Sequence, residues 1–389
     1  MPLSHSLPEP QTPLPPWSGG GFRSRLHVPR FAAIWVATAV LFAISPLIAS
    51  SSVSRSALLS MLPFAAILAI AAIGQTLVIQ QRGLDLSVPG MITLTTIIVT
   101  KIPNGHEDRL PKAFALVLLA CVASGLISGI AVTWLSITPL VATLGVNALL
   151  QGVVFQMTSG ASTAAATPDL ARFSLDKTAG VPNAVLIAGA AILLVAGTIR
   201  ATVVGRRFVA VGASPAAAHA AGVRVSAYKV ATYVFASITY GVAGVLVAGF
   251  LGTPGIGAGN DYLLPTIAAV VLGGTSLVGG VGSVVATGVG ALFLTQLEQV
   301  VRVRGAPASV QFVIQGSIIA LGMAVGAVQW RRLTAFARER TAARPLLARV
   351  GTTSSSHSPP APGADDPTPG EMSPASHQRD EPGQPPRGV

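Results

Sequence analysis

Long apolar segments alternate with short polar ones along most of this chain. The first two apolar runs, Phe31–Ala49 and Leu58–Ile79, have the length of about 20 residues that a helix needs to cross a bilayer. The same alternation continues to residue 328, and it predicts an all-α polytopic membrane protein with about ten transmembrane helices. The expected spans are 31–49, 58–79, 91–102, 113–135, 140–157, 184–199, 230–251, 266–272, 284–301 and 310–328.

Two of these runs, 91–102 and 266–272, are short for a spanning helix and adjoin glycine-rich segments. GLDLSVPG precedes the first of them, and GGTSLVGGVGS follows the second. A pair of interrupted apolar segments in the two halves of a chain points to a transport pathway. We therefore expect segments 83–91 and 273–283 to line such a pathway, although similarity between the two halves is weak.

The composition supports a membrane location. Hydrophobic residues make up 51% of the chain and charged residues only 10%, against roughly 25% charged in soluble domains. The first 28 residues are rich in proline and lack the apolar core of a signal peptide, so the first apolar run is expected to remain as an anchor. The predicted organisation is a disordered N-terminus over 1–28, a transmembrane domain over 29–330 and a basic, then disordered tail over 331–389.

The net charge of +11 lies mainly in loops and tails, as the positive-inside bias produces. With ten spans, both termini and the basic segment Arg200–Lys229 fall in the cytoplasm, whereas Arg302 and Arg304 are exceptions on the outer side. Basic residues are not interleaved with aromatic ones, which argues against nucleic-acid binding.

The basic segment carries a complete signature of a short helix. Ser214 is placed as an N-cap, Pro215 as the first helical residue and Gly222 as the stop. Two turns of helix are unstable alone in water, so the helix either rests on its own bundle or the lipid surface, or fits a groove on a cytosolic partner. The residues expected to couple to such a partner are Arg206, Arg207, Ser214, Pro215, Ala216, Ala217, His219, Ala220 and Gly222.

Polar residues within the apolar region are candidates for the pathway. A carboxylate is costly in a membrane, so Asp85 either pairs with Arg82 or shapes, with Ser87, a break that lines the pathway. Thr143, Asn147 and Gln151 recur on one helix face, which favours hydrogen bonds between helices or a hydrophilic wall. The pathway and gating candidates are Gln75, Arg82, Gly83, Asp85, Ser87, Thr143, Asn147, Gly273, Gly274, Thr275, Ser276, Gly279 and Gly280.

Catalytic and cofactor chemistry finds no support in the sequence. Cys121 is the single cysteine, which excludes an internal disulfide. No G-x-x-x-x-G-K-[ST] loop, HExxH motif or paired carboxylate occurs. We therefore expect no catalytic residues, no metal site and no cofactor bound by this chain.

Several segments together resemble a known family, the membrane permease subunit of bacterial ABC importers for ribose, xylose and other monosaccharides. GQTLVIQQRGLDLSVPG (74–90) resembles the family segment that ends in GGIDLSVG, and TPLVATLGV (138–146) resembles its P-F-I-x-T-L-G stretch. GRRFVAVGASPAAAHAAGVRV (205–225) resembles its cytoplasmic loop, and residues 268–294 resemble A-x-V-I-G-G-T-S-L-x-G-G-x-G-S. This sequence departs from the pattern at Arg82, which replaces a glycine, at the inserted Pro89, and at Ser214, where asparagine is usual.

The resemblance implies a transport subunit without ATPase activity in the bacterial inner membrane. It implies a second permease copy or a sister permease, an ABC ATP-binding subunit that uses ATP and Mg, a periplasmic or lipid-anchored solute-binding protein, and membrane lipid around the helices. ATP-driven closure of the partners would push the short cytoplasmic helices and turn the pathway from inward- to outward-facing. Alternatives are a permease for branched-chain amino acids or nucleosides, or an ion-coupled secondary transporter that would rely on Asp85 and Glu298.

Overall fold

The computed structural model of the chain describes residues 31–161, 164–305, 307 and 309–320. All of them belong to the first of two units, which ends at Arg331. The tails predicted to be disordered lie outside the described residues, as does the second part of the last apolar run.

The described chain is almost entirely helical, which confirms the predicted fold class. Its β-structure is one two-residue hairpin of β1 (Lys177–Thr178) and β2 (Val181–Pro182), and three 3₁₀ turns cover Ser50–Val53, Glu107–Arg109 and Asn260–Tyr262. The helices are α1 (Ala32–Ile48), α2 (Arg55–Gln80), α3 (Val88–Lys101), α4 (Leu110–Thr133), α5 (Pro139–Thr158), α6 (Pro168–Leu175), α7 (Asn183–Ala201), α8 (Val203–Ala213), α9 (Pro215–Ala220), α10 (Val225–Leu251), α11 (Leu263–Leu272), α12 (Val284–Val303) and Ser309–Ala320.

Each predicted apolar run coincides with a helix as far as the structure describes it, but the helices differ in length. Six of those in the described chain, α2, α4, α5, α7, α10 and α12, are long and apolar enough to cross a membrane. The others are shorter: α3 has 14 residues and therefore rises about 21 Å, less than the hydrocarbon thickness of about 30 Å.

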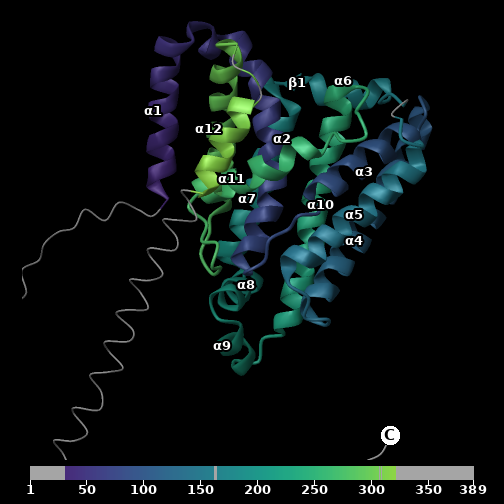
Figure 1. Cartoon of the computed structure of the whole chain (residues 1–389), viewed down its shortest axis with the longest axis vertical. Coiled ribbons are helices and arrows are strands. Elements are labelled where there is room, and N and C mark those ends of the chain that lie inside the picture. The colour runs from purple at the N-terminus through teal and green to yellow at the C-terminus, as the bar shows by residue number, and fades with distance from the viewer. Residues whose placement is uncertain (1–30, 162–163, 306, 308, 321–389) are drawn as a thin grey trace, which may run out of the picture. The chain divides into compact units, whose positions relative to one another are not determined.

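Helix α2 lies at the centre of the bundle, between α10, α12, α7 and α11 (Figure 1). Every residue from Ala65 to Gln80 is buried, as expected for a helix that is apolar on all sides. Gly74 allows the close approach of α10, since a Cβ there would lie 2.9 Å from the Cα of Ala236.

Small residues also bring α3 and α4 against α10. A Cβ on Gly129 of α4 would lie 2.8 Å from the Cα of Val230, and one on Gly244 of α10 would lie 2.8 Å from the carbonyl oxygen of Ile92. Such contacts are typical of helix packing in lipid, where close van der Waals contact replaces the hydrophobic driving force. The outward faces of α4, α5 and α7 carry exposed large apolar side chains, including Leu119 and Leu193, and these faces suit lipid rather than water.

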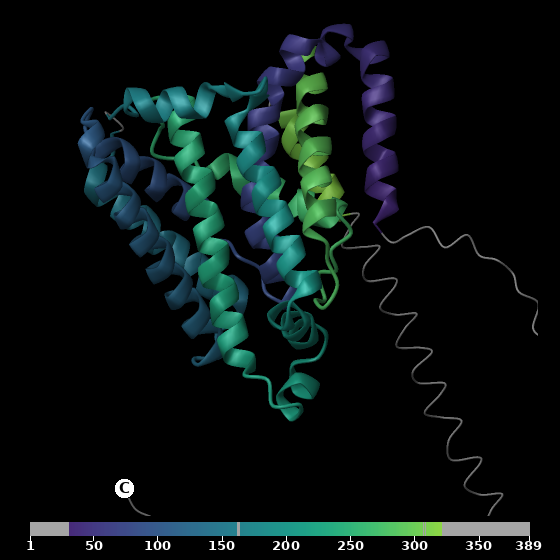
Figure 2. The same cartoon turned by 180° about the vertical axis from the view of Figure 1, so that it is seen from behind.

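The two ends of the bundle carry different elements. Helices α8 and α9 lie together at one end, and α6 with the β1–β2 hairpin lies at the opposite end (Figures 1 and 2). The segment 158–182, between two of the predicted apolar runs, contains α6, whose Arg172 and Asp169 form an ion pair at 3.4 Å.

Candidate functional site

The basic segment folds into two helices rather than the single short one expected. Helix α9 has the predicted signature: the Ser214 hydroxyl accepts the Ala217 N–H at 3.3 Å, and Gly222 has φ +78°. Helix α8 was not predicted, although Phe208 and Val211 are buried on one face at helical spacing. The following helix, predicted from residue 230, starts earlier, since α10 begins at Val225.

Helix α9 has little packing of its own. Ala218 is its one buried residue, whereas Ala216, Ala217, His219 and Ala220 are exposed. Arg206 and Arg207 on α8 are exposed as well, and neither forms an ion pair with a described residue. A short, exposed, alanine-rich helix flanked by free cations is a surface suited to a docking partner.

Helix α8 is tied to the end of α2. The Gln81 side chain donates to the carbonyl of Phe208 at 2.8 Å. The Arg82 guanidinium donates from Nε to the carbonyl of Gly212 at 2.9 Å and from a terminal nitrogen to that of Ala213. The carbonyls of Gly212 and Ala213 belong to the last turn of α8, and the C-terminal end of a helix carries a partial negative charge. Arg82 therefore holds the two residues that precede Ser214, the N-cap of α9.

This geometry corrects one interpretation of Asp85. Arg82 and Asp85 do not form an ion pair; Asp85 instead accepts the Ser87 N–H at 2.9 Å and the Ser87 hydroxyl at 2.6 Å. The carboxylate is 1% exposed and occupies the break between α2 and α3. Arg82 adopts φ +66°, a region that strains a residue with a side chain, and this turn directs its guanidinium to α8.

The second glycine-rich segment meets the same junction. The Gly280 N–H donates to the Gln80 carbonyl at 2.8 Å, and Gly279 closes a turn by donating to the Ser276 carbonyl at 2.9 Å. Gly279 and Gly280 both have positive φ, and a Cβ on Gly280 would lie 2.8 Å from the Cα of Ala213. The glycines thus permit a tight turn and a close contact with the end of α8. We call residues 80–82, 212–213 and 279–280 the inner junction.

The first residues of the same segment lie against α12. A Cβ on Gly273 would lie 2.7 Å from the Thr287 nitrogen, and Gly274 has φ +74°. Thr275 is buried. Deeper in the bundle, Gln75 is fully buried and accepts the Tyr240 hydroxyl at 3.1 Å, and Gly83 packs against Tyr233.

The polar face of α5 bonds to the first broken segment. The Thr143 hydroxyl accepts the Leu86 N–H at 2.9 Å, and the Asn147 side chain accepts the Gly90 N–H at 2.8 Å. These bonds satisfy backbone donors near the start of α3 that have no partner within the helix. These contacts agree with the expectation that the polar face of α5 forms hydrogen bonds to a neighbouring segment. Its role as a wall of the pathway stays a prediction.

The remaining acidic candidate lies elsewhere. Glu298 of α12 accepts the Gln315 side chain at 2.9 Å and lies 3.8 Å from Arg302. The described residues contain no group of three His, Cys, Asp or Glu side chains able to hold a metal ion.

A helical bundle with six helices able to cross a membrane in its described part, and with broken segments joined to an exposed basic helix pair, is typical of a polytopic membrane protein. The chain belongs to the family described as the branched-chain amino acid transport system permease component, whose model matches residues 57–323. It is 32% identical over 294 residues to the ribose import permease protein RbsC of Escherichia coli K12, covering 75% of this chain and 91% of that protein.

Permeases named for another solute are similar too. The autoinducer 2 import system permease protein LsrC of Photorhabdus luminescens is 33% identical over 234 residues, which cover 60% of this chain and 70% of that protein. The protein of the same name from Yersinia pseudotuberculosis is 31% identical over 290 residues, with 75% and 82% covered. No solved structure matches the chain.

Proposed function

We propose that this permease forms the pathway of an ATP-binding cassette importer for a small polar solute, a monosaccharide such as ribose or xylose. Its similarity to permeases named for ribose and autoinducer 2 supports this solute class. The family description names branched-chain amino acids, and these remain the alternative solute within the same mechanism.

In this proposal the chain works in an assembly. Two permeases pair, two ABC ATP-binding subunits dock beneath them and hydrolyse ATP with Mg, and a solute-binding protein delivers the solute from the other side. The chain itself binds no cofactor. It lies in the bacterial inner membrane with both termini in the cytoplasm, and the charge of the α8–α9 segment supports this orientation, because Lys and Arg favour the cytoplasmic side.

The proposed coupling rests on the contacts within the inner junction. A partner that pushes α9 moves Ser214, which follows directly on Ala213 and Gly212. Arg82 and Gln81 bind the carbonyls of this last part of α8, and they begin the connection to the α2–α3 break. Gly280 reaches the same point from the break before α12, so a displacement of α9 acts on both broken segments at once.

A charge-reversal variant tests this role. The change of Arg206→Glu and Arg207→Glu together with Ala217→Asp alters only exposed residues, so the protein is expected to insert and fold. In proteoliposomes with the partner subunits, we expect solute uptake to fall at least tenfold, because the docking surface is lost. Arg304→Glu is the matched control, since it reverses an exposed cation beyond the last turn of α12. Unchanged uptake by the triple variant would overturn the proposal.

The surroundings of Asp85 and Glu298 favour an ATP-driven importer over an ion-coupled carrier. A secondary carrier needs carboxylates or cation sites near the bilayer centre. Asp85 is bonded to Ser87, and Glu298 to Gln315, and the two acids lie on different parts of the bundle without forming a shared site.

A further inference from the structure

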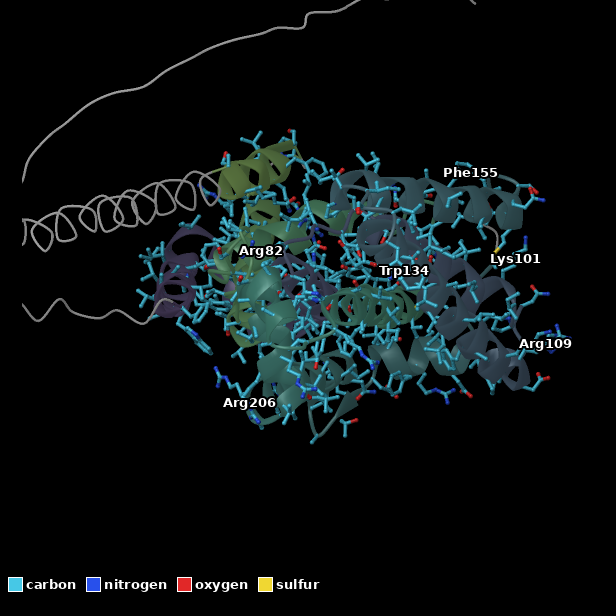
Figure 3. The ribbon with its side chains drawn as sticks, turned by 90° about the horizontal axis from the view of Figure 1, so that it is seen from below. Arg82, Lys101, Arg109, Trp134, Phe155 and Arg206 are labelled. Carbon is cyan, nitrogen blue, oxygen red and sulfur yellow. The ribbon has the colours of Figure 1, made fainter. Side chains whose placement is uncertain are left out.

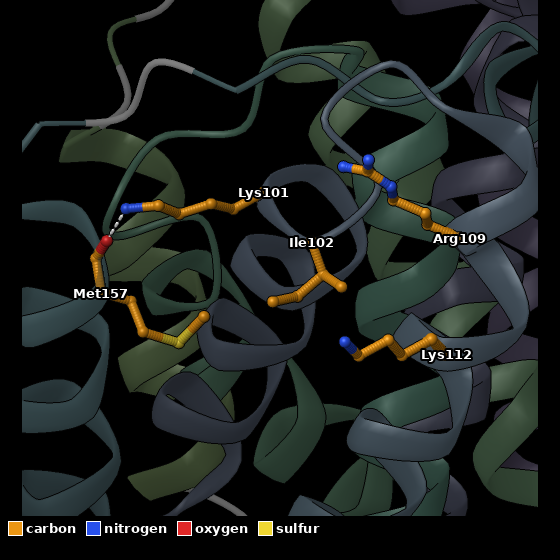
Figure 4. Close-up of a pocket in the computed structure, with 5 residues that line it drawn as sticks. All are labelled: Lys101, Ile102, Arg109, Lys112 and Met157. Carbon is orange, nitrogen blue, oxygen red and sulfur yellow. Dashed lines mark hydrogen bonds between the residues drawn. The ribbon is translucent and has the colours of Figure 1, made fainter.

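A small hollow lies at the end of the bundle opposite α8 and α9. It has a volume of about 400 Å³ and is lined by Lys101, Ile102, Arg109, Lys112 and Met157 (Figure 4). Lys101 ends α3 and Ile102 follows it, Arg109 ends the 3₁₀ turn before α4, and Lys112 and Met157 lie in the first turn of α4 and the last turn of α5. We call it the outer hollow, a name that rests on the orientation given under the proposed function.

Three cations line the outer hollow. Arg109 and Lys112 extend over Ile102 from one side, and Lys101 lies on the other side, where it donates to the carbonyl of Met157 (Figure 4). None of the three cations forms an ion pair with a described residue. The neighbouring Glu107 accepts the Asp169 N–H at 2.8 Å through one carboxylate oxygen, and it forms no ion pair with any of the three cations.

This charge sits where the positive-inside bias disfavours it. Short outer loops of membrane proteins are poor in Lys and Arg, yet three cations gather at one short connection between α3 and α4. The start of α4 adds the partial positive charge of a helix N-terminus to the same place. A local anionic ligand accounts for cations held at this position.

The surroundings identify the kind of anion. Ile102 and Met157 give the hollow an apolar floor. On α4, Phe114, Leu118 and Leu119 are 42%, 53% and 64% exposed, so an apolar surface continues from Lys112 toward the middle of the membrane. Lys101 and Arg109 lie at the edge of the bundle, far from Arg82 and Arg206 (Figure 3).

We propose that the outer hollow binds the phosphate diester of an anionic phospholipid, with the acyl chains along the exposed face of α4. Cationic groups above an apolar helix face match a headgroup phosphate joined to hydrocarbon chains. A free phosphate ion leaves the apolar floor and the α4 face uncovered. An acidic protein segment gains nothing from Leu118 and Leu119, which lie at membrane depth.

The test compares lipid retention by purified full-length variants. The triple change Lys101→Gln, Arg109→Gln and Lys112→Gln removes the charge and keeps polar side chains of similar length. Native mass spectrometry then measures phosphatidylglycerol and phosphatidylethanolamine bound after delipidation and readdition. Each cation near a membrane surface contributes about a fivefold gain in affinity for an anionic lipid, so we expect the triple variant to bind phosphatidylglycerol roughly 100-fold more weakly. Arg304→Gln, an exposed cation outside the hollow, is expected to bind like the wild type.

Three outcomes would overturn the assignment. Equal binding of phosphatidylglycerol by the triple variant and the wild type would show that the hollow is not the lipid site. Competition by millimolar inorganic phosphate would assign the hollow to a free anion. Normal lipid binding by the triple variant, together with lost stimulation of uptake by the solute-binding protein, would assign it to protein docking. The lipid measurement needs no ATP-binding partner, so it fails or succeeds independently of the proposed function.

Discussion

The backbone N–H of Gly280 donates a hydrogen bond to the carbonyl of Gln80 at 2.8 Å, across 200 residues of sequence. Gln80 ends α2, and Gly280 lies in the turn before α12. The bond joins the two broken segments of the chain at one point, and the last turn of α8 packs against the same point through Gly212. A single junction therefore links both interrupted segments to the helix pair that the proposed partner contacts.

Replacing Arg82 by glycine is expected to uncouple the junction while leaving the fold intact. The variant loses two charge-assisted hydrogen bonds, each contributing about 1.5–3 kcal/mol. It also relieves a left-handed backbone conformation that costs roughly 1–2 kcal/mol, so the melting temperature is expected to fall by only a few degrees.

The informative readout for Arg82→Gly is the solute moved per ATP hydrolysed in proteoliposomes. We expect this ratio to fall severalfold, because motion of α9 then reaches the end of α2 only through the Gln81–Phe208 bond and the contact at Gly212. Arg82→Lys keeps the charge but has one donor nitrogen in place of the two that reach Gly212 and Ala213, and it should give an intermediate ratio. A wild-type ratio for Arg82→Gly would rule out Arg82 as the link.

Gly212→Ala is expected to destabilise the protein. Its Cβ would overlap the carbonyl oxygen of Gln80, and overpacking of this kind costs about 1–3 kcal/mol. Gly197→Ala on α7 is the matched control, because no atom lies within 4 Å of its added Cβ, and alanine is the better helix former. Thermal unfolding in detergent should show a lower midpoint for Gly212→Ala alone; equal midpoints would contradict the tight contact between α8 and α2.

Ser214→Ala removes the N-cap of α9 and is expected to weaken partner binding. The cap contributes about 1 kcal/mol, and a helix of six residues has few other interactions to hold it. We expect affinity for an ATP-binding subunit, measured in nanodiscs, to fall about fivefold. Ser214→Asn supplies an equally good cap and should bind normally. Equal loss in both variants would show that the hydroxyl acts otherwise than as a cap.

Asn147→Leu tests the hydrogen bonds between α5 and the first broken segment. The Gly90 N–H would lose its partner, and an unpaired buried donor costs about 1–3 kcal/mol. Gln151→Leu, one turn further along α5, is the control, since no hydrogen bond ties its side chain to the described residues. The unfolding midpoint should fall for Asn147→Leu and stay nearly unchanged for Gln151→Leu. A larger fall for Gln151→Leu than for Asn147→Leu would contradict the structural role of the polar face of α5.

Much of this architecture could be predicted from the sequence, because apolar runs long enough to span a bilayer have few other structures open to them. The cap and stop of α9 were predictable for a similar reason, since Ser214, Pro215 and Gly222 act through local backbone geometry.

The contacts between distant segments were not predictable in the same way. Arg82 stands three residues from Asp85, so spacing favoured an ion pair, but the positive φ of Arg82 turns its side chain toward α8. Helix α8 was missed because its arginines suggested a solvated loop, although Phe208 and Val211 carried the helical period. The meeting of Gly280 with Gln80 depends on the packing of the whole bundle, which sequence periodicity does not determine.

The measurement that tests the central claim most directly is affinity purification of the tagged protein from mild detergent, followed by mass spectrometry. The account predicts recovery of an ATP-binding subunit with the wild type and its loss with the triple variant of Arg206, Arg207 and Ala217. Recovery of the permease alone, together with solute transport by the permease reconstituted without a partner, would contradict it and turn attention to Asp85 and Glu298.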